Sequence, residues 1–408
     1  MSIFFASLIV LAPLYVWRFS IDGLPTNFLM IANFVAIAFG LLMMLRGGNM
    51  TVKAKNIMVG LGRPMTVFIV LLGLASIISL VVFGVNGEKL AQWVVLYAQP
   101  LAIFFLIRYF NTDGKWNEHF RVAAYIVVGA AGALALVQYF TLFTLPPVWW
   151  GNANEPKRAI AFFAHANAFG LFMTPLLAWL IPDVVKKLRG IKVVASNAAT
   201  GNLVLAFLWV LGVSGMFFSL SRGAWLGFLV AAGIYVLISA NKKMILGFLL
   251  AGLVLAGVVA AVPNLRYRVL LPFQGEKSTV ARFSLWDTAG KMISDNPILG
   301  KGVNGFSDNW DKYNTDPGLE HYNFPHNILL NTWVDLGLLG VVSMFGVLLA
   351  SAWYGFLHRK ESVAAFGLLL FIAAMVVHGL IDIPYFKNDL ALLFWIVVAL
   401  SYTHLPRK

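Results

Sequence analysis

Long apolar runs alternate with short polar segments along the whole chain. A run of about 18 or more apolar residues predicts a membrane-spanning helix, because lipid offers the backbone no hydrogen-bond partner and a helix satisfies those groups internally. Twelve such runs are present, at residues 2–19, 26–45, 64–85, 90–109, 121–144, 159–181, 202–219, 223–240, 243–262, 326–356, 362–381 and 389–405. The pattern predicts an all-α polytopic membrane protein with about twelve transmembrane helices.

The composition agrees with this pattern. Of the 408 residues, 60% are apolar and 12% are charged, whereas a soluble domain carries roughly 25% charged residues. The absence of cysteine excludes disulfides and thiolate metal sites. No basic segment precedes the first apolar run, which favours a retained span over a cleaved signal peptide.

The distribution of Lys and Arg predicts the orientation. If the N-terminus is cytoplasmic, 17 of the 30 basic residues fall on the inner side, and seven of the other 13 lie in one long outer loop. Positive residues in short connections favour the cytoplasm, and long loops are exempt. We therefore expect both termini to be cytoplasmic. The net charge of +13 then reflects topology, and no basic patch with interleaved aromatic residues predicts a nucleic-acid partner.

The long outer loop, residues 263–325, is a candidate functional segment. Its 63 residues are too many for a plain connection. It divides the chain into residues 1–262 with nine spans, the loop itself, and residues 326–408 with three spans. Within it, the stretch STVARFSLWDTAGKMISDNP predicts a helix capped by Ser278 or Thr279. Four apolar residues spaced by three or four predict an amphipathic surface on the membrane or the bundle mouth: Phe283, Trp286, Ala289 and Ile293.

Two other features of this loop match ligand-binding patterns only superficially. The segment GKGVNG, residues 300–305, has the glycine spacing of dinucleotide-binding loops, but the required strand and helix of a parallel α/β unit are missing. We interpret it as a turn. The carboxylates of Asp308, Asp311 and Asp316 are loosely spaced among Asn and Lys, which favours a solvated loop over a metal site. No metal and no other cofactor is predicted from these residues, and a metal-dependent mechanism stays open as the alternative.

Conspicuous polar residues gather near the outer side of the predicted bundle. A charged residue inside a span costs about 2.5–3.5 kcal/mol on insertion scales, so each one requires a reason. Arg158 lies at the mouth of span six, Arg222 in a tight turn between spans seven and eight, and Arg282 in the long loop. The other candidates on this side are His165 and Asn167 in span six, His326 at the start of span ten, and His378 and Asp382 at the end of span eleven.

Span ten begins with a polar stripe. Asn327, Asn331 and Asp335 are four residues apart, so they share one helix face over about 12 Å. Such a stripe is expected to face the bundle interior or a wet cavity, because lipid would leave its donors and acceptors unpaired. His326 is offset from the stripe by about 100° at the water-facing end, where it can contact a molecule arriving from outside.

Three arginines and a histidine at one membrane face suggest chemistry on a phosphate-bearing ligand. The guanidinium group stays protonated and pairs with phosphate through two parallel hydrogen bonds. A neutral imidazole can accept a proton from a hydroxyl. Arginines that neutralise a pyrophosphate leaving group, together with one base for an acceptor hydroxyl, would suffice for glycosyl transfer.

Structural roles stay open for several of these residues. Arg158 and Arg282 could contact lipid headgroups, and His326 could simply begin a helix. A buried structural role is favoured for His165, and hydrogen bonding within the bundle is favoured for Asp335 and for the pair of His378 and Asp382.

With these residues in view, the sequence resembles the O-antigen ligase and polymerase superfamily of bacterial membrane glycosyltransferases. The matching segments, in the family's order, are RAIAFFAHANAFG (158–170), SLSRGAWLG (219–227), ARFSLWDTAGKMISDNPILGKGVNGF (281–306), PHNILLNTWVDLGLLG (325–340) and HGLID (378–382). The resemblance covers about the last 250 residues, and about the first 150 match only as generic spans.

The resemblance implies a GT-C-like fold in the bacterial inner membrane, with the active site at the periplasmic face. It implies a donor glycan linked to undecaprenyl pyrophosphate, a sugar hydroxyl of the lipid A core as acceptor, inversion at the anomeric carbon, and no need for metal. The family's essential residues map onto Arg222, Arg282 and His326, and less firmly onto Arg158. Asp335 stands where the family commonly has glutamate, which puts a catalytic role for it in doubt.

The function expected from this resemblance is that of an O-antigen ligase. Arg222 and Arg282 would hold the donor pyrophosphate, and His326 would deprotonate the acceptor. The candidate substrate-binding residues are Arg158, His165, Asn167, Asn327, His378 and Asp382. The expected partners are the lipid-linked glycan, the lipid A core and membrane lipids.

Three alternatives remain. An O-antigen polymerase of the same superfamily is the nearest, because the sequence separates it poorly from a ligase. An organic-anion transporter is less favoured, since transporters place charged sites near the midplane between internal repeats, and no repeat is visible here. A non-catalytic lipid-binding scaffold is the third.

Overall fold

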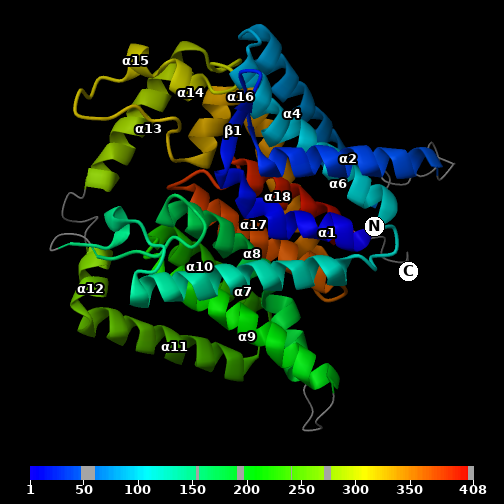
Figure 1. Ribbon diagram of the computed structural model, residues 1–408, viewed down its shortest axis with the longest axis vertical. Helices are drawn as coiled ribbons and strands as arrows, with labels where there is room; N and C mark the ends of the chain where they lie inside the picture. The colour runs from blue at the N-terminus through cyan, green and yellow to red at the C-terminus, as the bar shows by residue number, and fades with distance from the viewer. Residues whose placement is uncertain (47–59, 153–155, 191–196, 240, 271–276, 403–408) are drawn as a thin grey trace.

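The protein is a bundle of apolar helices with one small β-hairpin. The computed structural model describes residues 1–46, 60–152, 156–190, 197–239, 241–270 and 277–402. Several helices, among them α2, α7 and α11, run across the view in Figure 1, with the N-terminus at the right and α12 and α13 at the left. Five of the basic residues on which the predicted orientation depends lie outside the described residues: Lys53, Lys55, Lys192, Arg407 and Lys408.

The helices of the N-terminal half are α1 (Ser2–Leu11), η1 (Ala12–Val16), α2 (Phe28–Arg46), α4 (Arg63–Val82), α5 (Gly87–Trp93), η2 (Val94–Ala98), α6 (Gln99–Phe110), α7 (Asn117–Thr141), η3 (Pro147–Trp149) and α8 (Ala166–Arg189). Those of the C-terminal half are α9 (Asn197–Phe218), α10 (Arg222–Ser239), α11 (Lys242–Ala261), α12 (Pro263–Leu270), α13 (Lys277–Asp295), α14 (Gly305–Asp308), α15 (Trp310–Tyr313), α16 (Ile328–Leu357), α17 (Val363–Gly379) and α18 (Asn388–Ser401). The strands β1 (Arg18–Ile21) and β2 (Leu24–Asn27) pair antiparallel.

The helices coincide with the predicted apolar runs. Nine helices in the described part of the chain are long and apolar enough to cross a membrane, and three shorter apolar helices cover Ser2–Val16, Val363–Gly379 and Asn388–Ser401. Each of the twelve runs overlaps one of these helices. The prediction of an all-α polytopic membrane protein is confirmed, and the number of crossings and the orientation stay predictions.

Two boundaries differ from the prediction. The first run was predicted as one span, but its last residues belong to the β-hairpin. The two turn residues of this hairpin, Asp22 and Gly23, both adopt positive φ, as a type I′ turn requires. The sixth span was predicted to begin at residue 159, but α8 begins at Ala166. Its first residues are instead an irregular segment in which Ala161 has a positive φ of 49°.

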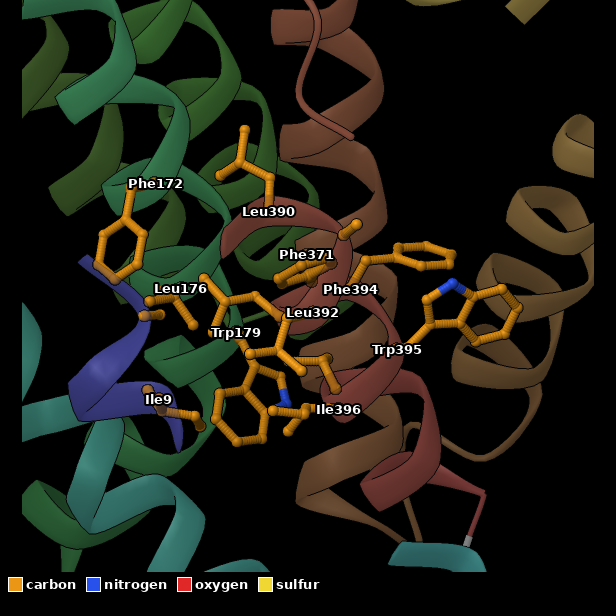
Figure 2. Packing of buried hydrophobic residues seen from close by; sticks show 14 of the residues in the cluster. Ile9, Phe172, Leu176, Trp179, Phe371, Leu390, Leu392, Phe394, Trp395 and Ile396 are labelled. Carbon is orange, nitrogen blue, oxygen red and sulfur yellow. The ribbon is translucent and has the colours of Figure 1, made fainter. Parts of the chain in front are cut away.

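Helix α18 lies at the centre of the core. Every side chain from Asp389 to Ser401 is buried. Figure 2 shows residues of α1, α8 and α17 arranged around it, among them Ile9, Trp179 and Phe371. A helix that is apolar on all sides needs an apolar environment on all sides, and here the protein itself supplies it.

Helix α11 has the same apolar character but the opposite environment. None of its residues is buried, and Leu249 and Leu253 are 62% and 70% exposed. Large exposed apolar surfaces mark contact with a membrane or a partner. In a polytopic bundle this helix fits a lipid-facing position.

The long loop contains helices α12 to α15, and the predicted amphipathic helix is α13. It begins at Lys277, so Ser278 and Thr279 lie in its first turn and not at its cap. The predicted apolar face is rotated from the observed one. Ala281, Leu285, Ala289 and Met292 are buried, whereas Phe283 is 62% exposed.

The GKGVNG segment docks against a kink in α16. Gly337 interrupts the helix with a φ of 66°. The backbone amide of the next residue, Leu338, donates to the carbonyl oxygen of Ile298 at 3.0 Å. Gly300 also has positive φ, and a Cβ there would lie 2.5 Å from the carbonyl oxygen of Val334. The glycines therefore serve a turn, as predicted, and they also permit a close backbone approach that was not predicted.

Candidate active site

A cavity of about 730 Å³ opens where the ends of several helices meet α12 and α13. We call it the arginine cavity. Five Lys or Arg side chains line it against two carboxylates, a formal excess of three positive charges. The lining charged residues are Arg158, Arg222, Arg268, Lys277, Arg282, Glu320 and Asp382. Asn167 and His378 also line it, so most of the predicted site residues come together here.

Arg222 is placed by the sharp turn between α9 and α10. Leu220 adopts a positive φ of 50°, and the Arg222 Nη1 donates to the carbonyl oxygen of Arg268 at 3.4 Å. Gly223 allows α10 to approach α17, since a Cβ there would lie 2.4 Å from a ring carbon of His378. The next residue after Arg222 therefore has to be small.

Arg158 is held by the irregular segment before α8. Gln138, a buried side chain of α7, accepts from the backbone amides of Ile160 and Ala161 at 3.1 and 2.8 Å and donates to the Ala161 carbonyl at 2.9 Å. These bonds replace a helical turn. Arg158 then reaches back, donating from Nη2 to Asn167 Oδ1 at 2.7 Å and from Nε to the Ser219 carbonyl at 2.9 Å.

Arg282 joins the long loop to the end of α17. Its Nε donates to the carbonyl oxygen of Ile381 at 3.0 Å, and its Nη1 donates to the carbonyl of Ser278 at 3.0 Å. One guanidinium edge thus fixes α13 against the segment that carries Asp382. The same side chain lines the arginine cavity.

His326 and Asp382 form a hydrogen-bonded pair beside this cavity. The His326 Nδ1 lies 2.9 Å from Asp382 Oδ1, and the side chains are 29% and 4% exposed. Burial acts to raise the pKa of Asp382, but the hydrogen bond with His326 and the nearby positive charges outweigh it and hold that pKa well below its ordinary value. Asp382 is therefore ionised at neutral pH and can only accept. His326 adopts an unusual positive φ of 48°, a strain common at functional positions.

Two of the predicted substrate-binding residues lie outside the arginine cavity. The side chain of Asn327 caps α16, accepting from Leu329 and Leu330 amides at 2.9 and 3.0 Å, and donates to the Leu380 carbonyl at 3.0 Å. Its predicted substrate contact stays a prediction. His165 was expected to be buried in a span, which is wrong. It is exposed at the position before α8, and partial loss of hydration, with the charges of Lys387 and Arg158, lowers its pKa.

The other two residues of the polar stripe lie in the protein interior and bond to each other. Asn331 and Asp335 are buried, and Asn331 Nδ2 donates to Asp335 Oδ2 at 3.0 Å. The stripe thus faces the bundle interior, as predicted. His378 is also buried, and among the described residues its Nδ1 has no hydrogen-bond partner.

Arg268 and Lys277 were missed by the sequence analysis. Arg268 is 9% exposed and donates from Nε to the Leu220 carbonyl at 3.1 Å. It follows Arg266, which is exposed and does not line the cavity, and the sequence LRYRVL does not distinguish the two. Only the fold of α12 shows which arginine faces inward.

Two of the three loop carboxylates are engaged in protein contacts. Asp308 pairs with Lys89 at 3.1 Å, and Asp316 accepts from the Ser284 hydroxyl at 3.1 Å. Within the described ranges no group of three or more His, Cys, Asp or Glu residues is arranged to hold a metal ion.

Comparisons with known proteins give two matches. Residues 206–345 match the model of a family described as O-Antigen ligase. The matched region contains Arg222, Arg268, Arg282 and His326. A relative from Haemophilus influenzae, described as an uncharacterized protein, is 24% identical over 155 residues, which cover 33% of this chain and 38% of the relative.

Proposed function

We propose that this chain, which belongs to the O-antigen ligase and polymerase superfamily, is an O-antigen ligase. It would move O-antigen polysaccharide from undecaprenyl pyrophosphate to a sugar hydroxyl of the lipid A core at the periplasmic face of the inner membrane. The observation that carries the proposal is the arrangement of Arg222 and Arg282 around one cavity, beside a histidine held by a carboxylate.

In this proposal the arginine cavity binds the donor pyrophosphate. Its excess positive charge suits an anion, and guanidinium groups bind phosphate oxygens in pairs. A hydrogen bond to a charged group contributes about 1.5–3 kcal/mol. Arg222 and Arg282 would contribute most in the transition state, when the leaving pyrophosphate gains negative charge. Arg158 and Arg268 would add to the same positive field.

His326 is the proposed general base. Because ionised Asp382 accepts from Nδ1, a neutral imidazole carries its proton there and leaves the Nε2 lone pair available. The same division of roles operates wherever a carboxylate orients a catalytic histidine. Asp382 would therefore act as the positioning residue.

The proposed step is one displacement. The acceptor oxygen attacks the anomeric carbon as its proton passes to Nε2 of His326, and a new glycosidic bond forms with inversion. The bond from that carbon to the pyrophosphate oxygen breaks, and undecaprenyl pyrophosphate leaves with the bonding electron pair. The imidazolium then returns its proton to water. No step in this scheme is routed through a metal.

The proposal is tested in a strain that lacks the gene and receives wild-type, His326→Ala or His358→Ala protein. His358 is a matched control, because it follows the other end of the same helix α16 and is paired with Glu361 at 3.1 Å. We expect O-antigen ladders with wild type and His358→Ala, and none with His326→Ala at equal membrane abundance.

The lipid-linked intermediates separate the two family activities. Loss of a ligase leaves full-length polymer on undecaprenyl pyrophosphate, whereas loss of a polymerase leaves lipid A core that carries a single repeat. Single-repeat products in the His326→Ala strain would replace the ligase proposal with the polymerase. Normal ladders in that strain would refute a catalytic role for His326.

A further inference from the structure

A second cavity, of about 290 Å³, is lined in part by the segments that carry His326 and Asp382. We call it the amide cavity. Five of its lining residues are Asn or Gln and four are aromatic: Asn27, Gln92, Asn304, Asn323, Asn388, Tyr15, Phe19, Phe324 and Phe386. Its walls come from the β-hairpin, α2, α5 and the two segments around the histidine pair.

The same two segments line both cavities. In the segment just before His326, Tyr322 lines the arginine cavity, and Asn323 and Phe324 line the amide cavity. In the segment between α17 and α18, Asp382 lines the arginine cavity, and Phe386 to Asn388 line the amide cavity. The hydrogen bond between His326 and Asp382 joins these two segments. Asp382 itself lines the arginine cavity, and the residues that line the amide cavity lie close to the pair in sequence.

The amide cavity has the chemistry of a carbohydrate site. A side-chain amide offers two donors and an acceptor, which matches the mixed donor and acceptor pattern of sugar hydroxyls. Aromatic rings cover the C–H faces of sugar rings and add a large apolar contact. Arg18 and Lys387 against Glu88 leave an excess of only one positive charge, so an anion is favoured far less than in the arginine cavity.

We infer that the amide cavity binds the acceptor saccharide and presents its hydroxyl to His326 from the side opposite the donor. The inference rests on the proposed function, because it assigns the second substrate of that reaction. A transfer between two lipid-anchored molecules needs two sites that meet at the base, and the volume of the cavity is close to the lower limit of roughly 300 Å³ for small-molecule sites.

Gln92 and Asn388 give the sharpest test. Both are half-buried, whereas Asn27, Asn304 and Asn323 already bond to Met30, Asp308 and Ser307. The variant Gln92→Ala/Asn388→Ala removes two amides that line the cavity. Asn202→Ala is the matched control, since Asn202 is a half-buried residue of α9 about 24 Å along the helix from its site end at Phe218.

Two binding measurements use the purified full-length protein. The first probe is the dephosphorylated core oligosaccharide from lipopolysaccharide without O-antigen, and the second is undecaprenyl pyrophosphate. We expect the double variant to weaken oligosaccharide binding about tenfold, because each hydrogen bond contributes a factor of roughly two to ten. Undecaprenyl pyrophosphate binding should be unchanged. Arg222→Ala should give the reverse pattern, and Asn202→Ala should match wild type.

Turnover separates failure of this inference from failure of the proposed function. If wild type forms product and the double variant has the same acceptor KM and oligosaccharide Kd, the inference is overturned and the ligase proposal stands. If wild type forms no product although the double variant loses oligosaccharide binding, the ligase proposal fails and the saccharide site stands. Gln92→Ala alone repeats the test with one change on α5, should the double variant not fold.

Discussion

The arginine cavity and the amide cavity are lined by the same two segments, those that carry His326 and Asp382, but differ in the side chains that line them. The first has five cationic side chains and a single amide, Asn167, and the second has two cationic side chains and five amides. Each cation of the first cavity comes from a turn, a loop or a helix end, where the backbone can bring charges together outside the apolar spans. A site that holds a leaving pyrophosphate needs charge, whereas a site that presents a neutral hydroxyl needs directional hydrogen bonds.

Removing the two central arginines should have the largest effect and should act on one substrate only. In Arg222→Ala/Arg282→Ala we expect undecaprenyl pyrophosphate to bind about 10²- to 10⁴-fold more weakly, because two charged contacts are lost. Binding of the core oligosaccharide should change less than about twofold. Calorimetric titration of both probes measures this, with Arg266→Ala, an exposed arginine of α12, as the control. Equal weakening of both probes would remove the distinction between the cavities.

Asp382→Asn should affect catalysis more than binding. The amide can donate to Nδ1, which favours the tautomer without a basic Nε2, so kcat should fall about 10- to 100-fold, less than for loss of the base itself. Both dissociation constants should stay near their wild-type values. Steady-state kinetics with saturating substrates tests this, and Asp311→Asn, at an exposed position of the long outer loop, should behave as wild type. An unchanged kcat would mean that Asp382 does not orient the base.

Added side-chain volume at the wall of the arginine cavity should destabilise the protein, whereas the same addition further along α10 should not. Gly223→Ala would place a methyl group 2.4 Å from the His378 ring, and overpacking of this kind costs about 1–3 kcal/mol. Gly233→Ala in the same helix would meet nothing closer than Phe248 at 3.6 Å, so it should be neutral or slightly stabilising. Unfolding in detergent measures both. A Gly223→Ala protein as stable as Gly233→Ala would contradict the close approach of α10 to α17.

The smallest expected effect concerns an aromatic wall of the amide cavity. Phe19 lines it from strand β1 and is 37% exposed, whereas Ile21 on the same strand does not line it. Phe19→Ala should raise the acceptor KM about 2- to 10-fold through loss of stacking, and Ile21→Ala should not. The donor KM should be the same for both. A Phe19→Ala protein with a wild-type acceptor KM would exclude stacking at this ring.

Much of the fold and the first cavity follows from the sequence. Apolar runs locate the helices because a helix is the only way for a single lipid-exposed segment to satisfy its own backbone. Arg222 and Arg282 were identifiable because a charge beside an apolar run demands a reason. The buried placement of Asn331 and Asp335 followed from their spacing of four residues.

The remaining features depend on contacts distant in sequence. Arg268 enters the cavity and Arg266 does not, although both stand in one short helix. Helix α8 begins later in the chain than predicted, because the backbone amides of the preceding segment donate to the side chain of Gln138 in α7. The amide cavity joins residues from 15 to 388, none of which is unusual alone. The hairpin had a local signal in Asp22 and Gly23, but the apolar run beside it was read as one span.

The central claim is that His326 takes the acceptor proton where the two cavities meet. The most direct measurement is product formation by wild-type and His326→Ala protein in lipid vesicles with lipid-linked glycan and lipid A core. The account predicts that His326→Ala binds both substrates within about twofold of wild type and forms product about 10²- to 10⁴-fold more slowly. Product formation at the wild-type rate would contradict it, because the base would then be a different residue.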